Sequence, residues 1–372
     1  MATVAPEAQP IPVAARPGRS GVRPEWLPDR IPAFDGLRGI AILAVLLYHS
    51  HDKVAGTWAE WLFKFGWAGV DLFFVLSGFL ITGIILETRD RPHYYRNFYA
   101  RRILRIWPMY FLLLALFYFI VPFLFSGHVF MWQGVKAAPW LMLLFFVQNL
   151  FHIELPGATG PTWSLAIEEQ FYLVWAPVAR FLGMRTMLVT LACVLCASPG
   201  IRHYGGGHLT LTHTLVHLDG LSVGCTIAVA VRFFQWSVST WRWLARGMLL
   251  AGASGIALML HHGSAFTSTL LSAGFGGMLL AALLPAARSR YQQALKARWL
   301  RHLGETSYGL YLMHILVFTM LWSYFDKYLD AHGLWGNVTV IVVRLVACIA
   351  FASLLWKYFE QPILRLKRHF TK

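Results

Sequence analysis

The sequence predicts an all-α protein, a polytopic transmembrane helix bundle with about ten spanning helices and one re-entrant or partial segment. The chain is 57% hydrophobic and only 13% charged, whereas a soluble domain is about 25% charged. Its apolar residues gather in long runs, and its basic residues gather in the short linkers between those runs. A water-soluble core cannot bury so much apolar surface, so we expect one membrane domain over residues 31–365.

Eleven apolar segments are candidate spans, although several are shorter than the roughly 20 residues that a crossing helix needs. They lie at about 33–50, 67–87, 106–125, 137–151, 162–182, 186–199, 213–233, 247–261, 266–286, 305–325 and 337–357. The lengths of the apolar segments alone do not decide how many of them cross the membrane. We therefore use the charges of the linkers to decide the number of crossings.

Basic linkers are expected on the cytoplasmic side, because positively charged loops remain there. The basic residues are Arg89, Arg91, Arg96, Arg101, Arg102 and Arg105, then Arg180 and Arg185, then Arg232, Arg242 and Arg246, then Arg288, Arg290, Lys296, Arg298 and Arg301, and finally Arg365, Lys367, Arg368 and Lys372. This placement accounts for the net charge of +15 without a nucleic-acid partner. It predicts cytoplasmic termini and therefore an even number of crossings.

An even number requires residues 137–182 to contribute one net crossing, although they hold two apolar runs. The run 137–151 is short and Pro156-Gly157 follows it, so we expect a re-entrant or partial segment there. Irregular backbone at membrane depth needs surrounding protein or a water-filled cavity. We therefore predict a cavity near Thr162–Gln170, and an extracytoplasmic linker over residues 199–211.

The ends of the chain and its cysteines complete the expected organisation. Residues 1–30 are rich in Pro, Ala and Arg and hold no apolar run, which predicts a flexible cytoplasmic tail rather than a signal peptide. Residues 366–372 are expected to form a basic cytoplasmic tail. The cysteines lie in apolar stretches, and the Cys-x-x-Cys spacing has no second ligand pair. We expect small core residues at Cys193, Cys196, Cys225 and Cys348.

Arg38 and His49 lie in the first expected helix, eleven residues apart. On an α-helix that separation is three turns plus about 20° and about 16 Å of rise, so both side chains share one face. An ionisable residue inside a membrane segment is a functional hypothesis by default. The alternative is that Arg38 snorkels to the headgroups and His49 is a helix end near water. Both interpretations remain open from this stretch alone.

The second and third helices carry further polar residues. Asp71 is either functional or an interfacial cap, and Ser77, beside a glycine, is expected only to permit a close helix contact. Arg102 and Arg105 are three apart and share a helix face. Positive-inside topology alone would explain both arginines. Guanidinium groups also bind phosphate bidentately, so the pair suits a polyphosphate ligand such as coenzyme A.

The run from Pro161 to Trp175 places Ser164, Glu168, Glu169 and Gln170 among apolar residues. Ser164 and Glu168 are four apart, so their side chains face the same way. One glutamate could instead pair with an arginine of another helix. A carboxylate at membrane depth usually lines a site, so a functional role is favoured.

Two histidine positions favour a structural interpretation. His314, in the tenth segment, is expected to be hydrogen-bonded within a packed aromatic helix. His213 and His217 have a spacing that a metal could use, but no third ligand is evident. We therefore expect no metal site.

Together these motifs resemble the acyltransferase 3 family of membrane O-acyltransferases over about residues 31–365. The motifs in order are Asp35-Gly-Leu-Arg38-Gly…His49, Gly69-Val-Asp71-Leu-Phe-Phe-Val-Leu-Ser-Gly-Phe, Arg102-x-x-Arg105-Ile-x-Pro, Trp163-Ser164-Leu-x-x-Glu168-Glu-Gln-Phe-Tyr and Ser307-Tyr-x-Leu-Tyr-Leu-x-His314. We expect a departure from one branch of the family, namely that this chain lacks the C-terminal esterase-like domain. We expect its membrane domain to suffice or a separate partner to act.

The resemblance implies a ten-helix core in the bacterial inner membrane and an acyl-CoA donor, usually acetyl-CoA. It implies a carbohydrate or lipid-linked glycan acceptor, with hydroxyls of surface polysaccharide, lipopolysaccharide or peptidoglycan as the typical targets. The implied catalytic residues are His49, Glu168 and Ser164, and the implied donor-binding residues are Arg38, Arg102 and Arg105. His49 would be the general base, with Glu168 orienting it or stabilising its cation.

Two alternatives remain. Some relatives modify small molecules, so a macrolide or a glycolipid is an alternative acceptor. A solute transporter would also carry polar residues in its helices. It should show internal repeats and paired broken helices, and the sequence contains neither. The enzyme is therefore the favoured interpretation.

Overall fold

The computed structural model describes residues 23–28, 31–120, 140–151, 155, 157–205, 209–261, 264–285, 289–321 and 333–370. Within these residues every regular element is a helix, as the sequence predicted. The expected N-terminal tail, residues 1–30, lies outside the described residues except for 23–28.

The longer helices follow the apolar segments, with the exception of 137–151. They are α1 (Pro32–Tyr48), α3 (Gly69–Thr88), α4 (Tyr94–Ala115, extended by a π-helical turn over Leu116–Ile120), α7 (Thr162–Phe181), α8 (Met184–Gly205), α9 (Leu218–Phe233), α10 (Val238–His261), α11 (Thr267–Leu283), α14 (Ser307–Leu321) and α16 (Gly333–Leu355). The shorter helices are α2 (Ala59–Lys64), α6 (Trp140–Leu144), α12 (Arg290–Leu295), α13 (Arg298–Glu305) and α17 (Gln361–Arg365).

Five of the described helical stretches are long and apolar enough to cross a membrane. They are Ala59–Thr88, Tyr94–Ile120, Met184–Gly205, Val238–His261 and Trp335–His369. The helices Thr267–Leu283 and Ser307–Leu321 are apolar but shorter. The chain is therefore an integral membrane protein of the helical type, and the count of about ten crossings stays a prediction.

Several boundaries differ from the sequence prediction or refine it. The described part of 137–151 contains the five-residue helix α6 and a 3-10 turn, Gln148–Leu150. A helix of that length rises only about 7 Å.

Helix α4 begins at Tyr94 rather than near 106, because its arginines hide the helical pattern from a hydropathy count. Helix α8 continues through Pro199 to Gly205, so the expected linker over 199–211 is wrong in its first half. Membrane helices tolerate an internal proline when neighbours satisfy the freed carbonyl.

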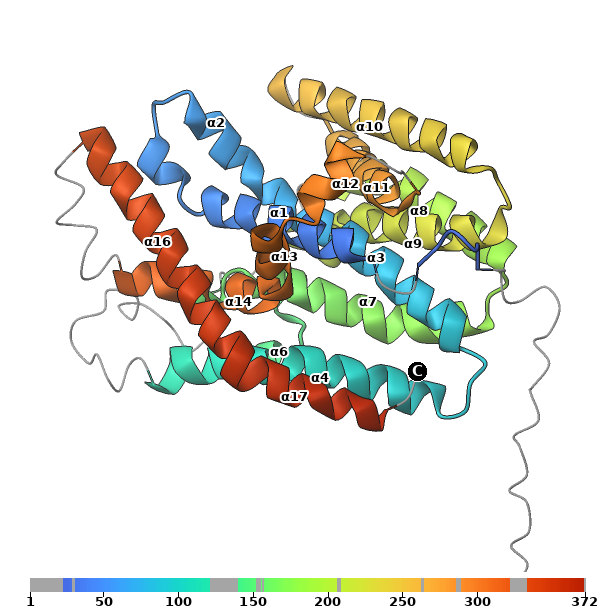
Figure 1. Ribbon diagram of the computed structural model, residues 1–372, viewed down its shortest axis with the longest axis horizontal. Helices are drawn as coiled ribbons and strands as arrows, with labels where there is room; N and C mark the ends of the chain where they lie inside the picture. The colour runs from blue at the N-terminus through green and yellow to red at the C-terminus, as the bar shows by residue number, and fades with distance from the viewer. Residues whose placement is uncertain are drawn as a thin grey trace, which may run out of the picture.

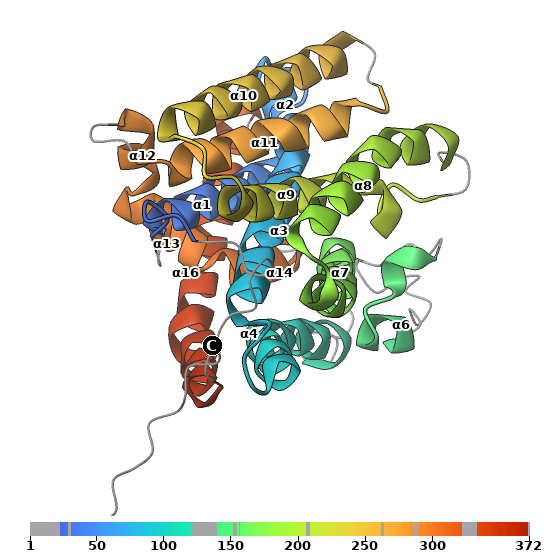
Figure 2. The same ribbon diagram turned by 90° about the vertical axis from the view of Figure 1, so that its right-hand side faces the viewer.

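Helices α1 and α3 lie in the middle of the molecule, with α10 and α11 on one side and α4, α16 and α17 on the other (Figures 1 and 2). Helix α3 packs against α9 at two glycines. A Cβ at Gly78 would collide with the carbonyl oxygen of Leu221, and one at Gly224 would collide with that of Val75. Small residues are what allow membrane helices to approach this closely.

The cysteines differ in burial. Cys225 and Cys348 are buried in the core, as expected, but Cys193 and Cys196 are exposed on α8. The expectation was wrong for this pair, because an apolar residue on an outer helix can face lipid instead of the core. Apolar sequence alone does not separate these two environments.

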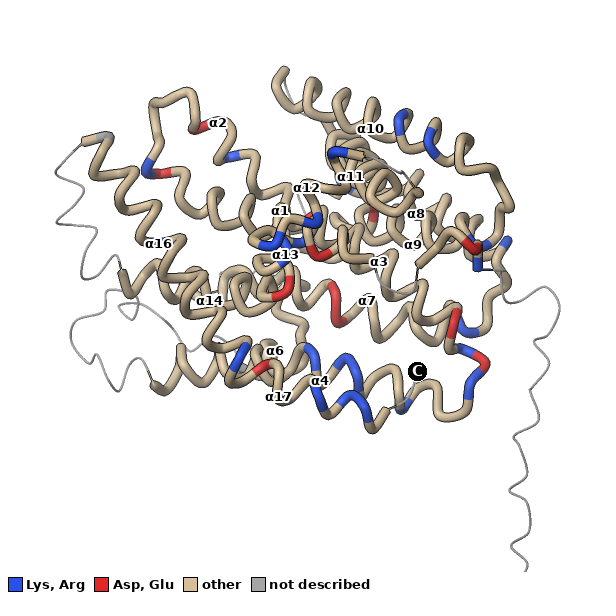
Figure 3. Tube along the Cα trace, viewed as in Figure 1, with Lys and Arg blue, Asp and Glu red and all other residues tan. Residues whose placement is uncertain are grey.

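Figure 3 shows that Lys and Arg residues follow α4 and also lie at the right-hand side, near the connection from α3 to α4. Acidic residues also lie within the bundle, including on α7. The molecule therefore combines a basic end with charged groups in its interior, and these interior groups define the candidate site.

Candidate active site

A cavity of about 260 Å³ lies among α1, α3, α4, α7 and α14. Its polar lining comprises Arg38, Ser77, Arg102, Arg105, Ser164, Glu168, Tyr172, Ser307, Tyr308 and Tyr311. Five of the six residues predicted from the sequence therefore share one cavity, and His49 is the exception. The cavity expected near Thr162–Gln170 is confirmed, because α7 contributes Ser164 and Glu168 to the wall.

The three cavity arginines differ in how they are held. The Arg105 guanidinium is 2.5 Å from Oε1 of the buried Glu360, and it lies over the Tyr308 ring. Arg38 is 3.4 Å from Asp35 on its own helix. The Arg102 guanidinium lies 5.9 Å from the centre of the Tyr172 ring.

Nε of Arg102 is buried with no hydrogen-bond partner in the described part of the chain. A wall of three guanidinium groups, with one buried donor unsatisfied, suits a phosphate-bearing ligand.

Glu168 is the carboxylate of the cavity, and both of its oxygens accept hydrogen bonds. Ser77 donates to Oε1 at 2.6 Å, and Tyr172 donates to Oε2 at 2.9 Å. The expectation that Ser77 serves only a close helix contact is wrong, because its neighbour Gly78 makes that contact instead. Tyr172 was not singled out from the sequence, although its spacing of four from Glu168 places both side chains on one helix face.

The other polar residues of α7 have different roles. Gln170 donates to the carbonyl of Phe146 at 2.7 Å and to Asn149 at 2.8 Å, and it accepts from Thr214 at 2.5 Å. These bonds anchor the segment after α6 to α7, which explains an amide in an apolar run. Glu169 accepts from Trp107 at 3.4 Å.

Ser164 meets α14 at the cavity wall. Its Oγ is 2.6 Å from the Tyr311 hydroxyl. That hydroxyl in turn lies 2.9 Å from the carbonyl of Pro161, to which it donates. Ser164 and Tyr311 therefore couple the start of α7 to α14, and both residues line the cavity.

His49 follows α1 directly and contacts α14 rather than α7. Its Nδ1 is 3.0 Å from the Val45 carbonyl and 3.3 Å from Nε2 of His314. The His314 ring is fully buried and lies 5.9 Å from the Tyr311 ring, which connects the histidine pair to the cavity wall.

Glu168 was expected to orient His49, but its hydrogen bonds go to Ser77 and Tyr172, and His314 contacts His49 instead. The expectation that His314 is hydrogen-bonded within the bundle is confirmed by its bond to the Tyr311 carbonyl. The contact between His314 and His49 was not predicted from the sequence.

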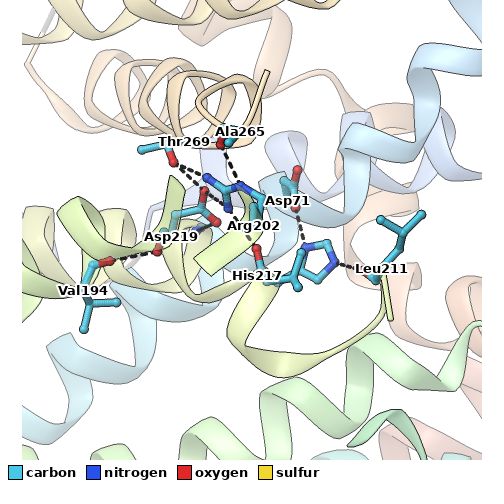
Figure 4. A network of polar contacts seen from close by, with 11 residues as sticks. Asp71, Val194, Arg202, Leu211, His217, Asp219, Ala265 and Thr269 are labelled. Atoms are coloured by element: carbon cyan, nitrogen blue, oxygen red, sulfur yellow. Dashed lines mark hydrogen bonds and ion pairs between the residues drawn. The ribbon is translucent and has the colours of Figure 1, made fainter. Parts of the chain in front are cut away.

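A second polar network lies where α8, α9 and α11 meet (Figure 4). Arg202 pairs with Asp219 at 2.9 Å and donates to Thr269, while Asp71 is 3.5 Å from His217. Asp71 therefore contacts the imidazole of His217, and is more than the interfacial cap considered from the sequence.

Both ring nitrogens of His217 face acceptors, because Nε2 lies 2.8 Å from the Leu211 carbonyl. Burial alone would lower the pKa of His217, but the hydrogen bond and charge of Asp71 hold that pKa above its usual value.

Among the described residues, no group of three His, Cys, Asp or Glu side chains is placed to hold a metal ion. His213 uses its Nδ1 to accept from the backbone N–H of Leu215 at 3.2 Å. The spacing of His213 and His217 therefore corresponds to a local turn and a buried ion pair in this structure.

Comparison with known proteins gives the family. The family described as an acyltransferase domain, acyltransferase 3, matches residues 31–357. The chain belongs to this family. No solved structure matches the chain.

The relatives found include proteins named as O-acetyltransferases. The peptidoglycan O-acetyltransferase OatA of Listeria monocytogenes is 26% identical over 90% of this chain and 56% of the relative. The O-acetyltransferase OatA of Staphylococcus aureus is 27% identical over 91% of this chain and 58% of the relative. The putative peptidoglycan O-acetyltransferase YrhL of Bacillus subtilis is 30% identical over 90% of this chain and 55% of the relative. The chain thus spans little more than half the length of these relatives.

Proposed function

We propose that this chain is a membrane-embedded O-acyltransferase that moves an acyl group, most simply acetyl, from cytoplasmic acyl-CoA to a hydroxyl of a cell-wall glycan. The observation that carries the proposal is the cavity, which brings three guanidinium groups, a carboxylate and a serine from three separate helices together. A solute pathway has no need of a polyphosphate-binding wall beside a base. The names of the relatives favour a peptidoglycan hydroxyl over a macrolide or glycolipid acceptor.

The donor would enter from the basic end. Arg102 and Arg105 would bind its phosphates, with Arg38 as a third cation. The pantetheine arm would then extend past Glu168 toward Ser164 and Tyr311. Glu168, held by two hydroxyl donors, would present a fixed acceptor for an amide N–H of that arm. Arg38 and His49 are separated by about 16 Å of helix, which matches an extended arm.

His49 would be the general base. Its Nε2 would take the proton of the acceptor hydroxyl as the hydroxyl oxygen attacks the thioester carbonyl. The carbon–sulfur bond then breaks, and the thiolate recovers the proton from His49 to leave as CoA thiol. Ser164 would turn its O–H from Tyr311 to the carbonyl oxygen as its negative charge develops, while Tyr311 keeps its own O–H on the Pro161 carbonyl.

The proposed topology has crossings at α1, α3, α4, α7, α8, α9, α10, α11, α14 and α16, with both termini in the cytoplasm. Single cysteines at Gly206, Ser289 and Thr371 in a cysteine-free background test it with a membrane-impermeant thiol reagent on intact cells. Labelling at position 206 alone is the expected result. Labelling at 371 as well would require an odd number of crossings and would contradict the proposed path of the donor.

Activity is tested with purified protein in nanodiscs, supplied with radiolabelled acetyl-CoA and soluble peptidoglycan fragments. We expect CoA release and label in the fragments, located by mass spectrometry on a sugar hydroxyl. His302→Leu is a matched control, because His302 contacts Ser353 on an exposed face away from the cavity. Thioester turnover equal to that of empty nanodiscs would contradict the enzyme assignment.

A further inference from the structure

Two histidines from distant parts of the chain meet behind the cavity residue Tyr311, whose ring lies 5.9 Å from that of His314. His49 directly follows α1, and His314 lies in α14, with their ring centres 4.7 Å apart. The hydrogen bonds around both rings determine where the protons must be, because a backbone carbonyl can only accept.

The proton positions follow ring by ring. Nδ1 of His314 is 2.7 Å from the Tyr311 carbonyl, so this nitrogen carries a proton. In a neutral ring Nε2 then has a lone pair and can only accept. Nδ1 of His49 is 3.0 Å from the Val45 carbonyl and must also carry a proton. The contact of 3.3 Å between Nδ1 of His49 and Nε2 of His314 is therefore a second hydrogen bond that His49 donates.

We propose that His314 is a positioning residue that holds His49 in the tautomer with a free Nε2 lone pair. This inference rests on the proposed function of His49 as the base. The opposite tautomer of His49 would place the single Nδ1 lone pair against both the Nε2 lone pair of His314 and the carbonyl oxygen of Val45. A cationic His314 would place N–H against N–H. With both rings neutral, the contacts are therefore satisfied only when Nε2 of His49 is unprotonated, and a His49 cation keeps the same two donations from Nδ1.

The same contact supports the reaction after the proton has moved. When the acceptor O–H bond breaks and the Nε2–H bond forms, His49 becomes a cation whose Nδ1–H still donates to Val45 and His314. A hydrogen bond to a charged group is stronger than the same bond to a neutral one. His314 thus stabilises the charge that develops in the transition state more than it stabilises the resting enzyme, and its loss should lower kcat.

The kinetic test compares His314→Leu, His314→Gln and the control His302→Leu. Leucine cannot accept a hydrogen bond, whereas the glutamine side-chain oxygen can. We expect His314→Leu to lower kcat by about 10- to 100-fold, the range for losing a hydrogen bond to a charged group. The KM for acetyl-CoA should not change, because the guanidinium wall is untouched. His314→Gln should recover most of the lost kcat, and His302→Leu should match wild type.

The second test identifies the tautomer of His49 by NMR and needs no measurement of activity. Histidine labelled with ¹⁵N in nanodisc-embedded protein should give a His49 signal with Nδ1 protonated and Nε2 bare, assigned by its loss in His49→Ala. A population with protonated Nε2 should appear in His314→Leu and be smaller in His314→Gln. An unchanged His49 signal in His314→Leu would overturn the inference, as would equal kcat losses in the Leu and Gln variants.

The two proposals fail in different ways. Wild-type turnover in His314→Leu together with loss of turnover in His49→Ala would refute the positioning role and leave the base intact. Wild-type turnover in His49→Ala would refute the base itself, whatever the NMR spectra give.

Discussion

Substitutions at Arg105 and Glu360 can distinguish an effect on the stability of the protein from an effect on its binding of the donor. In Arg105→Ala the Glu360 carboxylate, 4% exposed, would lose a guanidinium at 2.5 Å. Breaking a buried ion pair costs about 3–5 kcal/mol, because one charge remains buried without compensation. Arg105→Ala should therefore lower the thermal unfolding midpoint in detergent by several degrees. Arg102→Ala should leave that midpoint near wild type, because Arg102 donates no hydrogen bond from its buried Nε in the described structure.

Both variants should weaken CoA binding. Loss of a charge-assisted hydrogen bond to phosphate is worth about 1.5–3 kcal/mol, which is a 10- to 100-fold rise in Kd measured by titration calorimetry. The double variant Arg105→Ala/Glu360→Ala should regain most of the lost stability and none of the CoA affinity. Equal midpoints for Arg105→Ala and wild type would refute the role of the pair. Unchanged CoA affinity in both single variants would mean that these arginines only mark topology.

Three other outcomes follow. His49→Ala should abolish acetyl transfer in the nanodisc assay without changing expression or the circular dichroism of the helices. Gly78→Ala should cost about 1–3 kcal/mol through overpacking of α3 on α9, whereas Gly247→Ala, with open space around its Cβ, should cost far less; unfolding midpoints in detergent measure both. The raised pKa of His217 adds stability below about pH 6.5 that is lost as pH rises through that pKa. As the pH rises above about 6.5, the unfolding midpoint should fall in wild type but not in Asp71→Asn. Equal changes of the midpoint with pH in both proteins would contradict the ion pair.

The sequence predicted the helices and the cavity residues from local patterns. Helical spacing placed Ser164 and Glu168 on one face, and the structure has both in the cavity wall. The presence of charged residues in apolar runs indicated which faces turn inward, because lipid does not tolerate them. Both signals depend on residues within a few turns of each other, so a single helix contains the information.

Contacts between distant segments could not be predicted this way. His49 and His314 are 265 residues apart, and Arg105 and Glu360 are 255 apart. Which helices become neighbours depends on shape, such as the close approach of α3 and α9 at Gly78. Periodicity identifies the buried face of a helix and says nothing about its partner. The interpretation of Ser77 was wrong for the same reason, since its partner Glu168 lies on another helix.

The polar groups of the bundle interior are arranged so that most satisfy one another. Glu168 has Ser77 and Tyr172, and Arg105 has Glu360. A buried polar atom without a partner costs about 1–3 kcal/mol, and a ligand or a water can complete one that faces a cavity. Nε of Arg102 is such an atom on a side chain that lines the cavity. In the proposed function, Arg102 would be the arginine most available to a donor phosphate, and Arg105 would share its guanidinium between the phosphate and Glu360.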